Sequence, residues 1–139
     1  MSAEAGAVSE ERRSEETTRG VRVEVESSYE AERSVPQDRY FFFAYRVRIT
    51  NVGDERVQLE RRRWRITDAD GTVQEVEGPG VVGAQPVLAA GQSFEYTSFC
   101  PLRTPLGWME GAYSMVGAGG ERFEAAIGRF ALEAPHTVN

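Results

Sequence analysis

Residue types that often carry enzyme chemistry are scarce in this 139-residue chain. It has one cysteine, Cys100, and one histidine, His136, so neither an internal disulfide nor a zinc site with several Cys and His ligands can form. The G-x-S-x-G motif of serine hydrolases is also missing. We therefore expect a protein that is not an enzyme and holds no metal or other cofactor, with Cys100 as a buried structural thiol.

Long hydrophobic runs are missing as well. The longest strongly apolar run, residues 40–45, is far shorter than the roughly 20 residues that a membrane span needs. The N-terminal segment is acidic where a secretory signal would have a basic flank and an apolar stretch. Acidic residues number 22 against 16 basic ones, and the net charge of −6 excludes bulk nucleic-acid binding. We expect a soluble cytoplasmic protein.

The chain length fits one domain preceded by a short tail. Residues 1–18 contain five acids and no aromatic residue, so they cannot bury enough apolar surface to offset the entropy lost on ordering. We predict that residues 1–18 form a disordered acidic tail and that residues 19–139 form the folded domain.

Apolar and polar residues alternate along most of the domain, as in Val21, Val23 and Val25, and this period of two is typical of strands with one buried face. Glycines, prolines and an Asp-Gly pair at residues 70–71 mark turns between the apolar stretches. The predicted strands are residues 21–26, 40–50, 57–67, 72–76, 93–99, 111–116 and 122–132. Short strands at this spacing predict an all-β fold, an antiparallel β-sandwich or barrel.

The predicted strand at residues 57–67 changes the parity of its buried side chains. Leu59 lies at an odd position, whereas Trp64 lies at an even one. One extra residue would let both face the core, so we predict a β-bulge between Glu60 and Arg63. We also predict that Trp64 is the central core residue.

Arginine supplies every basic side chain, because the sequence has no lysine. We expect the strands at 40–50 and 57–67 to form a hairpin whose outward residues are close neighbours. A positive face of this kind would suit an anionic ligand or an acidic protein partner. The alternative is a solvated face balanced by nearby glutamates. The residues of this predicted face are Arg46, Arg48, Arg61, Arg63 and Arg65.

Residues 78–83 match the G-x-G-x-x-G pattern, with glycines at Gly78, Gly80 and Gly83. In a dinucleotide-binding fold the pattern opens a helix, but here Pro86 follows, so we reject that fold. Two interpretations remain. The loop amides could form a concave site for a pyrophosphate-type anion, or the glycines could serve tight turns and close strand approach.

Several of these features together resemble the ApaG family of small bacterial proteins, over about residues 21–135. The resemblance is carried by Arg62-Arg63-Trp64-Arg65-Ile66-Thr67-Asp68, Asp70-Gly71, Glu75-Val76, the glycine pattern, Gln85-Pro86, Gly91, Phe94, Tyr96-Thr97-Ser98, Leu102, Thr104-Pro105, Gly107, Met109, Gly111, Tyr113 and Met115. It implies a fibronectin type III-like or immunoglobulin-like β-sandwich. It also implies an association with cobalt and magnesium efflux or resistance, a role in protein interaction, and a pyrophosphate site at the three glycines.

The expected function is a non-catalytic binding module. Its ligand would be an unidentified protein held by the arginine face, and its link to metal efflux would be indirect, since no membrane span is expected. The alternative is a sensor of pyrophosphate or of a dinucleotide such as diadenosine tetraphosphate. An exposed edge strand would also allow two copies to pair as a homodimer.

Overall fold

The computed structural model describes residues 10–135 of the chain. The described part is made of strands and three single-turn 3-10 helices. The strands are β1 (Arg13–Thr18), β2 (Val21–Tyr29), β3 (Phe41–Asn51), β4 (Val57–Asp68), β5 (Val73–Pro79), β6 (Val87–Leu88), β7 (Ser93–Leu102), β8 (Leu106–Gly117) and β9 (Arg122–Glu133). The 3-10 helices are η1 (Glu10–Arg12), η2 (Ala31–Arg33) and η3 (Pro36–Asp38). Within this part of the chain, no helix is long and apolar enough to cross a membrane.

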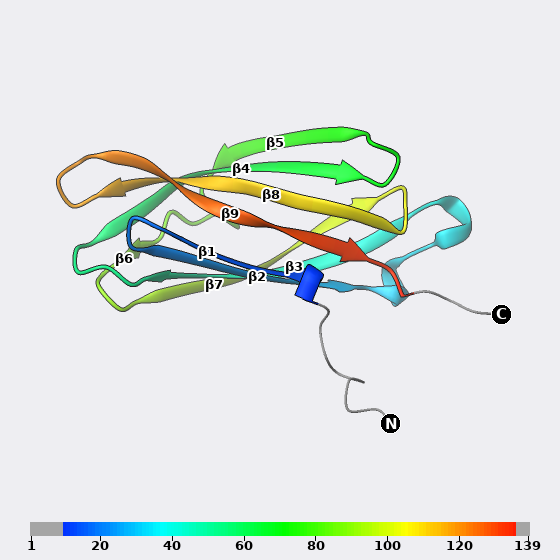
Figure 1. Ribbon diagram of the computed structural model, residues 1–139, viewed down its shortest axis with the longest axis horizontal. Helices are drawn as coiled ribbons and strands as arrows, with labels where there is room; N and C mark the ends of the chain where they lie inside the picture. The colour runs from blue at the N-terminus through cyan, green and yellow to red at the C-terminus, as the bar shows by residue number, and fades with distance from the viewer. Residues whose placement is uncertain (1–9, 136–139) are drawn as a thin grey trace, which may run out of the picture.

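The strands form two antiparallel sheets that face each other (Figure 1). One sheet has the order β1-β2-β3-β7, and the other has the order β5-β4-β8-β9, with β6 also paired to β4. The predicted all-β antiparallel sandwich is therefore confirmed.

The alternating pattern in the sequence determines which side chains lie between the sheets. Val21, Val23 and Val25 of β2 are buried, and Val47 and Ile49 of β3 lie beside them in the core. The intervening polar residues point outwards, so these strands bury one face in the core and direct polar side chains to solvent on the other.

The predicted bulge in β4 is present. Leu59 pairs with Met115 and Arg61 with Ser114, so Glu60 is the extra residue. It moves the inward positions from odd to even numbers, and both Leu59 and Trp64 are buried as a result.

Trp64 lies at the centre of the core, as predicted. Its side chain is 2% exposed. Its ring packs edge-on against Tyr45 at 5.2 Å, Phe130 at 6.0 Å and Tyr113 at 6.4 Å between centroids. Edge-to-face pairs at such distances contribute about 1 kcal/mol each beyond simple burial.

The prediction of a disordered tail through residue 18 is wrong for residues 10–18, which form η1 and β1, and residues 1–9 lie outside the described part. β1 pairs with β2 over its whole length, from Arg13 opposite Glu26 to Thr18 opposite Val21. The strand has no apolar residue, so the hydrophobic pattern could not reveal it. Its backbone ladder and its packing on β9 stabilise it instead; Thr18 Oγ1, for example, accepts a hydrogen bond from the Ala126 amide at 3.1 Å.

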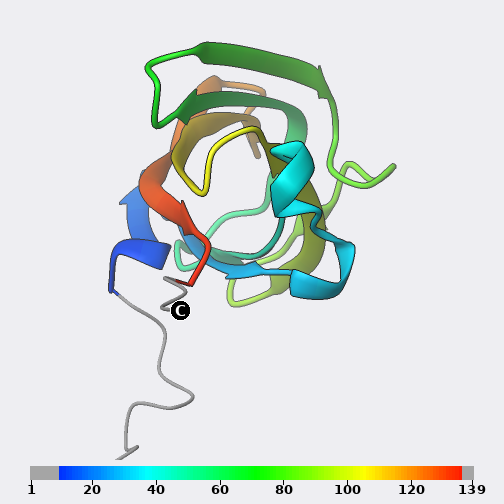
Figure 2. The same ribbon diagram turned by 90° about the vertical axis from the view of Figure 1, so that its right-hand side faces the viewer.

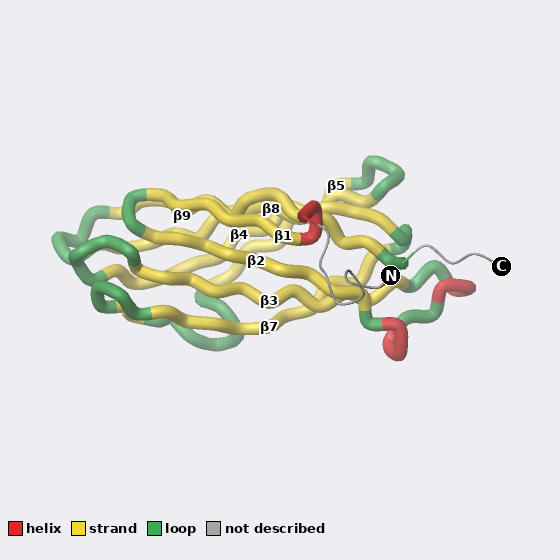
Figure 3. The backbone as a smooth tube through the Cα atoms, turned by 60° about the horizontal axis from the view of Figure 1, so that its bottom comes forward, coloured by secondary structure: helices red, strands yellow, loops and turns green. Residues whose placement is uncertain are grey.

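The sandwich is closed along one side and open along the other. β1 and β2 lie against β9, so strands of the two sheets follow one another around that side (Figures 2 and 3). On the opposite side the sheets end at the edge strands β5 and β7, which do not pair with each other. The open side holds the cavity described below.

Candidate functional site

The structure separates the five arginines of the predicted positive face. Strands β3 and β4 belong to different sheets, so the expected hairpin between them is wrong. Asn51 ties down the connection between them: its side-chain Nδ2 donates hydrogen bonds to the carbonyl oxygens of Glu55 at 2.7 Å and Leu88 at 3.0 Å. Each sheet therefore presents its own arginines on its own outer surface.

On the outer face of the first sheet, carboxylates surround the arginines. Arg46 pairs in register with Glu26, and Arg48 with Glu24. Arg48 also lies 3.5 Å from Glu95 of β7. This surface is mixed in charge and not positive.

The outer face of the second sheet has the same character. Arg63 donates two hydrogen bonds to Glu124, at 2.9 and 3.1 Å, and this pairing lowers the pKa of Glu124. Arg65 lies 3.6 Å from Glu75. Both pairs are largely exposed, so each contributes little to stability. The solvated-face alternative describes these arginines better than an anion-binding face does.

The second half of the glycine loop is a tight turn. Val81 and Ala84 exchange two backbone hydrogen bonds of 2.8 Å, with Val82 and Gly83 between them. Both central residues have positive φ, +40° at Val82 and +83° at Gly83, as a type I′ turn requires. The third glycine of the pattern therefore has a conformational role.

The first two glycines make room for neighbouring groups. A Cβ at Gly78 would lie 2.9 Å from Nη2 of Arg62, and one at Gly80 would lie 2.3 Å from the Ala84 carbonyl oxygen. The guanidinium of Arg62 crosses this strand end, and its Nη1 donates to the carbonyl oxygens of Pro79 at 2.9 Å and Gly80 at 3.0 Å. No helix follows the loop in the described part of the chain.

Internal hydrogen bonds already use most of the loop amides. Gly80 N–H donates to the Glu60 carbonyl, and Val81 N–H donates to Ala84. Among residues 80–84, only the amides of Val82 and Gly83 have no backbone acceptor within residues 10–135. This arrangement resembles a structural turn more than a cradle for an anion.

A cavity of about 260 Å³ lies between the sheets on the open side of the sandwich. We call it the inter-sheet cavity. Its walls come from β3, β4, β5, β7 and β8. The lining residues are Tyr45, Arg62, Trp64, Ile66, Gln74, Val76, Ser98, Phe99, Cys100, Pro101 and Met109. Its lining mixes aromatic and apolar side chains with the polar Arg62, Gln74 and Ser98, and its volume is smaller than that of most ligand sites.

Two of the residues that line this cavity have polar atoms without a hydrogen-bond partner among the described residues. The Trp64 indole Nε1 is buried and has no hydrogen-bond partner among the described residues. Arg62 uses only Nη1 in hydrogen bonds there. Cys100 is buried as expected, and desolvation raises its pKa to about 12, so it is not a reactive thiolate.

Buried tyrosines lie beside the cavity. The hydroxyl groups of Tyr96 and Tyr113 form a hydrogen bond, and burial raises the pKa of both phenols. Burial also raises the pKa of Tyr45, while a hydrogen bond with Ser98 opposes the rise. These phenols stay neutral near pH 7 and act as hydrogen-bonding core residues.

An exposed aromatic stack covers the outer face of the first sheet near the C-terminal end of β7. The Phe42 ring stacks on Tyr40 at 5.9 Å and on Phe99 at 5.5 Å. The Arg33 guanidinium lies over Phe42 at 4.2 Å and over Phe99 at 4.7 Å. We call these four residues the aromatic patch. The alternating sequence pattern does not predict this patch, although the aromatic run at residues 40–43 is a signal for it.

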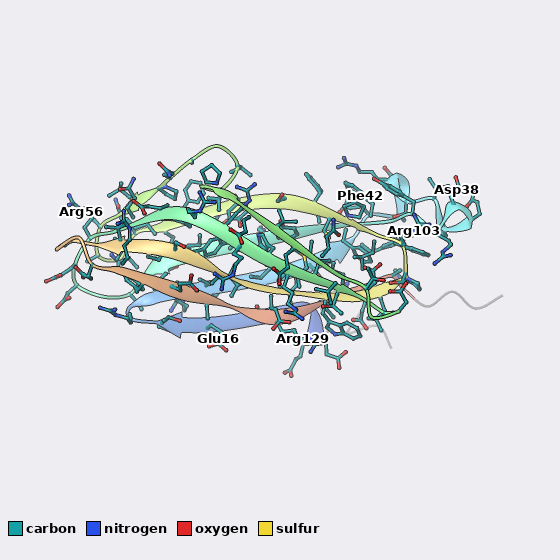
Figure 4. All side chains as sticks on the ribbon, turned by 90° about the horizontal axis from the view of Figure 1, so that it is seen from above. Glu16, Asp38, Phe42, Arg56, Arg103 and Arg129 are labelled. Carbon is teal, nitrogen blue, oxygen red and sulfur yellow. The ribbon has the colours of Figure 1, made fainter. Side chains whose placement is uncertain are left out.

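In Figure 4, Phe42, the η3 residue Asp38 and Arg103, which follows β7, all lie toward the same end of the molecule. No group of three or more His, Cys, Asp or Glu side chains in residues 10–135 could hold a metal ion. His136 lies outside the described residues.

Comparison with known proteins identifies the family. A model of the ApaG domain matches residues 31–117. The chain is 57% identical to a protein named ApaG from Rhodospirillum centenum, over 87% of this chain and 93% of that protein. It is 56% identical to the ApaG protein of a Methylobacterium species, over 86% of this chain and 92% of that one.

A solved structure agrees with these matches. The crystal structure of a Bordetella pertussis protein described as ApaA superposes with a TM-score of 0.82 at 50% identity, covering 84% of this chain and 95% of that chain. The sequence matches and the shared β-sandwich together show that the chain belongs to the ApaG family.

Proposed function

We propose that this ApaG-family chain is a non-catalytic binding module whose ligand is another protein, held at the aromatic patch. One observation carries the proposal: two exposed rings, Phe99 at 45% and Tyr40 at 40%, both stack on the Phe42 ring between them. Exposed aromatic residues that lie side by side are typical of protein-binding surfaces.

The arrangement of the patch supports a binding role. Arg33 stacks on two of the rings, which holds its guanidinium in place before any partner arrives. Tyrosine and arginine are enriched among the residues that contribute most to protein–protein affinity. A rigid patch also loses less side-chain entropy on binding than a flexible one.

The association with cobalt and magnesium resistance would then be indirect. A partner protein bound at the patch would carry the effect on metal transport, and this chain would regulate or recruit that partner.

The experiment compares partner capture by three proteins in cells of the source organism. The first is the unchanged chain, the second carries Tyr40→Ser and Phe99→Ser, and the third carries Val73→Ser. Val73 is 43% exposed on β5, in the other sheet, and serves as the matched control. In-cell crosslinking followed by quantitative mass spectrometry should recover specific partners with the unchanged and control proteins. The double variant should recover about tenfold less of the same partners. Equal recovery by all three proteins would contradict the proposal.

A second candidate is a pyrophosphate-type anion at the glycine loop. The amides of Val82 and Gly83 favour it, because they are free of backbone partners in the described part of the chain. Titration with pyrophosphate and with diadenosine tetraphosphate, followed through amide NMR shifts, tests it. Saturable shifts of these two amides would support the anion site; unchanged shifts at millimolar ligand would mean that the loop is a structural turn.

A further inference from the structure

The edge of β7 presents unpaired backbone groups. Asn51 N–H donates to the Gln92 carbonyl at 2.9 Å, directly before β7. Antiparallel pairs alternate between hydrogen-bonded and non-bonded residues, and β3 and β7 pair in a regular register from Thr50 opposite Ser93 onwards. Even-numbered residues of β7 therefore bond to β3, and odd-numbered residues direct their N–H and C=O groups to the free edge.

Two further observations agree with this assignment. The Phe42 carbonyl accepts a hydrogen bond from Glu30 N–H at 2.9 Å, so it points away from β7. The residue opposite Phe42 on β7 is Pro101, which has no N–H group to donate. Prolines within sheets occur where the missing donor would face solvent. The unpaired edge thus includes the amides of Glu95, Thr97 and Phe99.

The inter-sheet cavity opens beside this edge. Four consecutive residues of β7, residues 98–101, form one wall, and Arg62 lies on the opposite wall in β4. Among the described residues, β7 has a strand neighbour only on its β3 side. A segment laid along the free edge would therefore pass the mouth of the cavity.

We infer that β7 accepts an extended segment of a partner protein as an added strand, with one apolar side chain of that segment seated in the inter-sheet cavity. This inference rests on the proposed function, because it takes the ligand to be a protein. Added strands gain affinity from main-chain hydrogen bonds and specificity from pockets for alternate side chains, and this edge offers both.

The cavity determines the chemistry of the segment. Its volume of about 260 Å³ exceeds the roughly 150 Å³ in which an engineered protein cavity holds benzene, so a leucine, methionine or aromatic side chain fits.

Two arginines beside the free edge favour an acidic residue next to the apolar side chain of the added segment. Arg33 and Arg62 lie on opposite faces of the sheet edge, and neither has a carboxylate within 4.0 Å among residues 10–135. Arg62 keeps Nη2 and Nε for a carboxylate. Because successive side chains of a strand point to opposite faces, an acidic residue next to the seated apolar one would face Arg33, and the expected segment alternates apolar and acidic side chains.

The test selects peptides from a displayed library of random ten-residue sequences against the full chain. We expect the selected peptides to carry a large apolar residue beside Asp or Glu. A synthetic copy of a selected peptide should slow hydrogen exchange at the amides of Glu95, Thr97 and Phe99 by at least about tenfold. Selected peptides that leave the exchange of these amides unchanged, or a library that yields no binding peptide, would overturn the inference. So would protection that rises with protein concentration without peptide, because the edge would then pair with a second copy.

Two variants sharpen the test. Thr97→Pro removes one edge donor without touching the β3 ladder, and Thr97→Ala keeps the donor as the control. Thr97→Pro should weaken peptide binding about tenfold or more, whereas Thr97→Ala should bind as the unchanged chain does. If circular dichroism shows that Thr97→Pro is unfolded, the exchange measurement on the unchanged chain decides alone.

The same variants separate this inference from the proposed function. If Thr97→Pro recovers cellular partners that the Tyr40→Ser and Phe99→Ser variant loses, the added strand is wrong and the protein-binding module stands. If neither variant loses partners, both proposals fail.

Discussion

At the residue scale, ionisable groups in the core make the stability of the protein depend on pH. The buried phenols of Tyr45, Tyr96 and Tyr113 have raised pKa values, and burial raises the pKa of Cys100 to about 12. In the unfolded chain these groups ionise near pH 8.5 for cysteine and pH 10 for tyrosine. Above these values the unfolded state binds fewer protons than the folded state, so alkali favours unfolding.

We predict that the free energy of unfolding falls as pH rises above about 9. Each group should remove up to about 1.4 kcal/mol per pH unit once the pH exceeds its unfolded pKa. Urea titrations at pH 8, 9.5 and 10.5 measure the slope. Tyr113→Phe should make the slope shallower, although the loss of its hydrogen bond to Tyr96 lowers stability at every pH. A flat profile between pH 8 and 10.5 would contradict this account.

Val82 stores backbone strain at the tip of the glycine loop. It is β-branched, exposed and held at a φ of +40°, a region that costs such residues about 1 kcal/mol or more. Val82→Asn should therefore raise the free energy of unfolding by about 1 kcal/mol, since asparagine before glycine suits a type I′ turn. Gly83→Ala provides the opposite case. It has open space around the new Cβ but a φ of +83°, and it should lower stability by a similar amount. If urea unfolding shows that both variants are stabilised or that both are destabilised, Val82 does not store backbone strain.

At the element scale, β1 shows how a strand can lack any hydrophobic signal. Its six residues are polar or charged, yet they pair with β2 and contact the bulged part of β9. Gly128 lies in that bulge, and a Cβ there would meet the Glu16 side chain at 3.0 Å. β1 therefore covers the edge of β2 and closes one side of the sandwich.

Removal of β1 should destabilise the domain and expose the β2 edge. We expect a chain that begins at Gly20 to lose about 2 kcal/mol or more, because a whole ladder of backbone hydrogen bonds disappears. It should also show concentration-dependent association, since an uncovered edge can pair with other chains. A chain that begins at Glu10 is the control. Urea unfolding and analytical ultracentrifugation measure the two effects, and equal behaviour of both truncations would mean that β1 is dispensable.

The strands that could be predicted from the sequence are those whose side chains alternate. Val21 to Val25 revealed β2, and the parity change from Leu59 to Trp64 revealed the bulge at Glu60. The hairpin between β3 and β4 was predicted wrongly because turn residues after Asn51 look alike whether the chain returns in the same sheet or crosses to the other. The inter-sheet cavity depends on which edge strands of the two sheets lie opposite each other. The local pattern of side chains does not contain that information.

At the scale of the whole molecule, the closed and open sides of the sandwich differ in backbone protection. On the open side, β7 bonds to β3 through its even-numbered residues and leaves its odd-numbered amides at the free edge. Hydrogen exchange of the free protein should therefore alternate along one strand. We expect slow exchange at Tyr96, Ser98 and Cys100, and exchange at least about tenfold faster at Glu95 and Thr97. Slow exchange at all five amides would mean that another segment or a second copy covers β7, which would remove the edge on which an added strand depends.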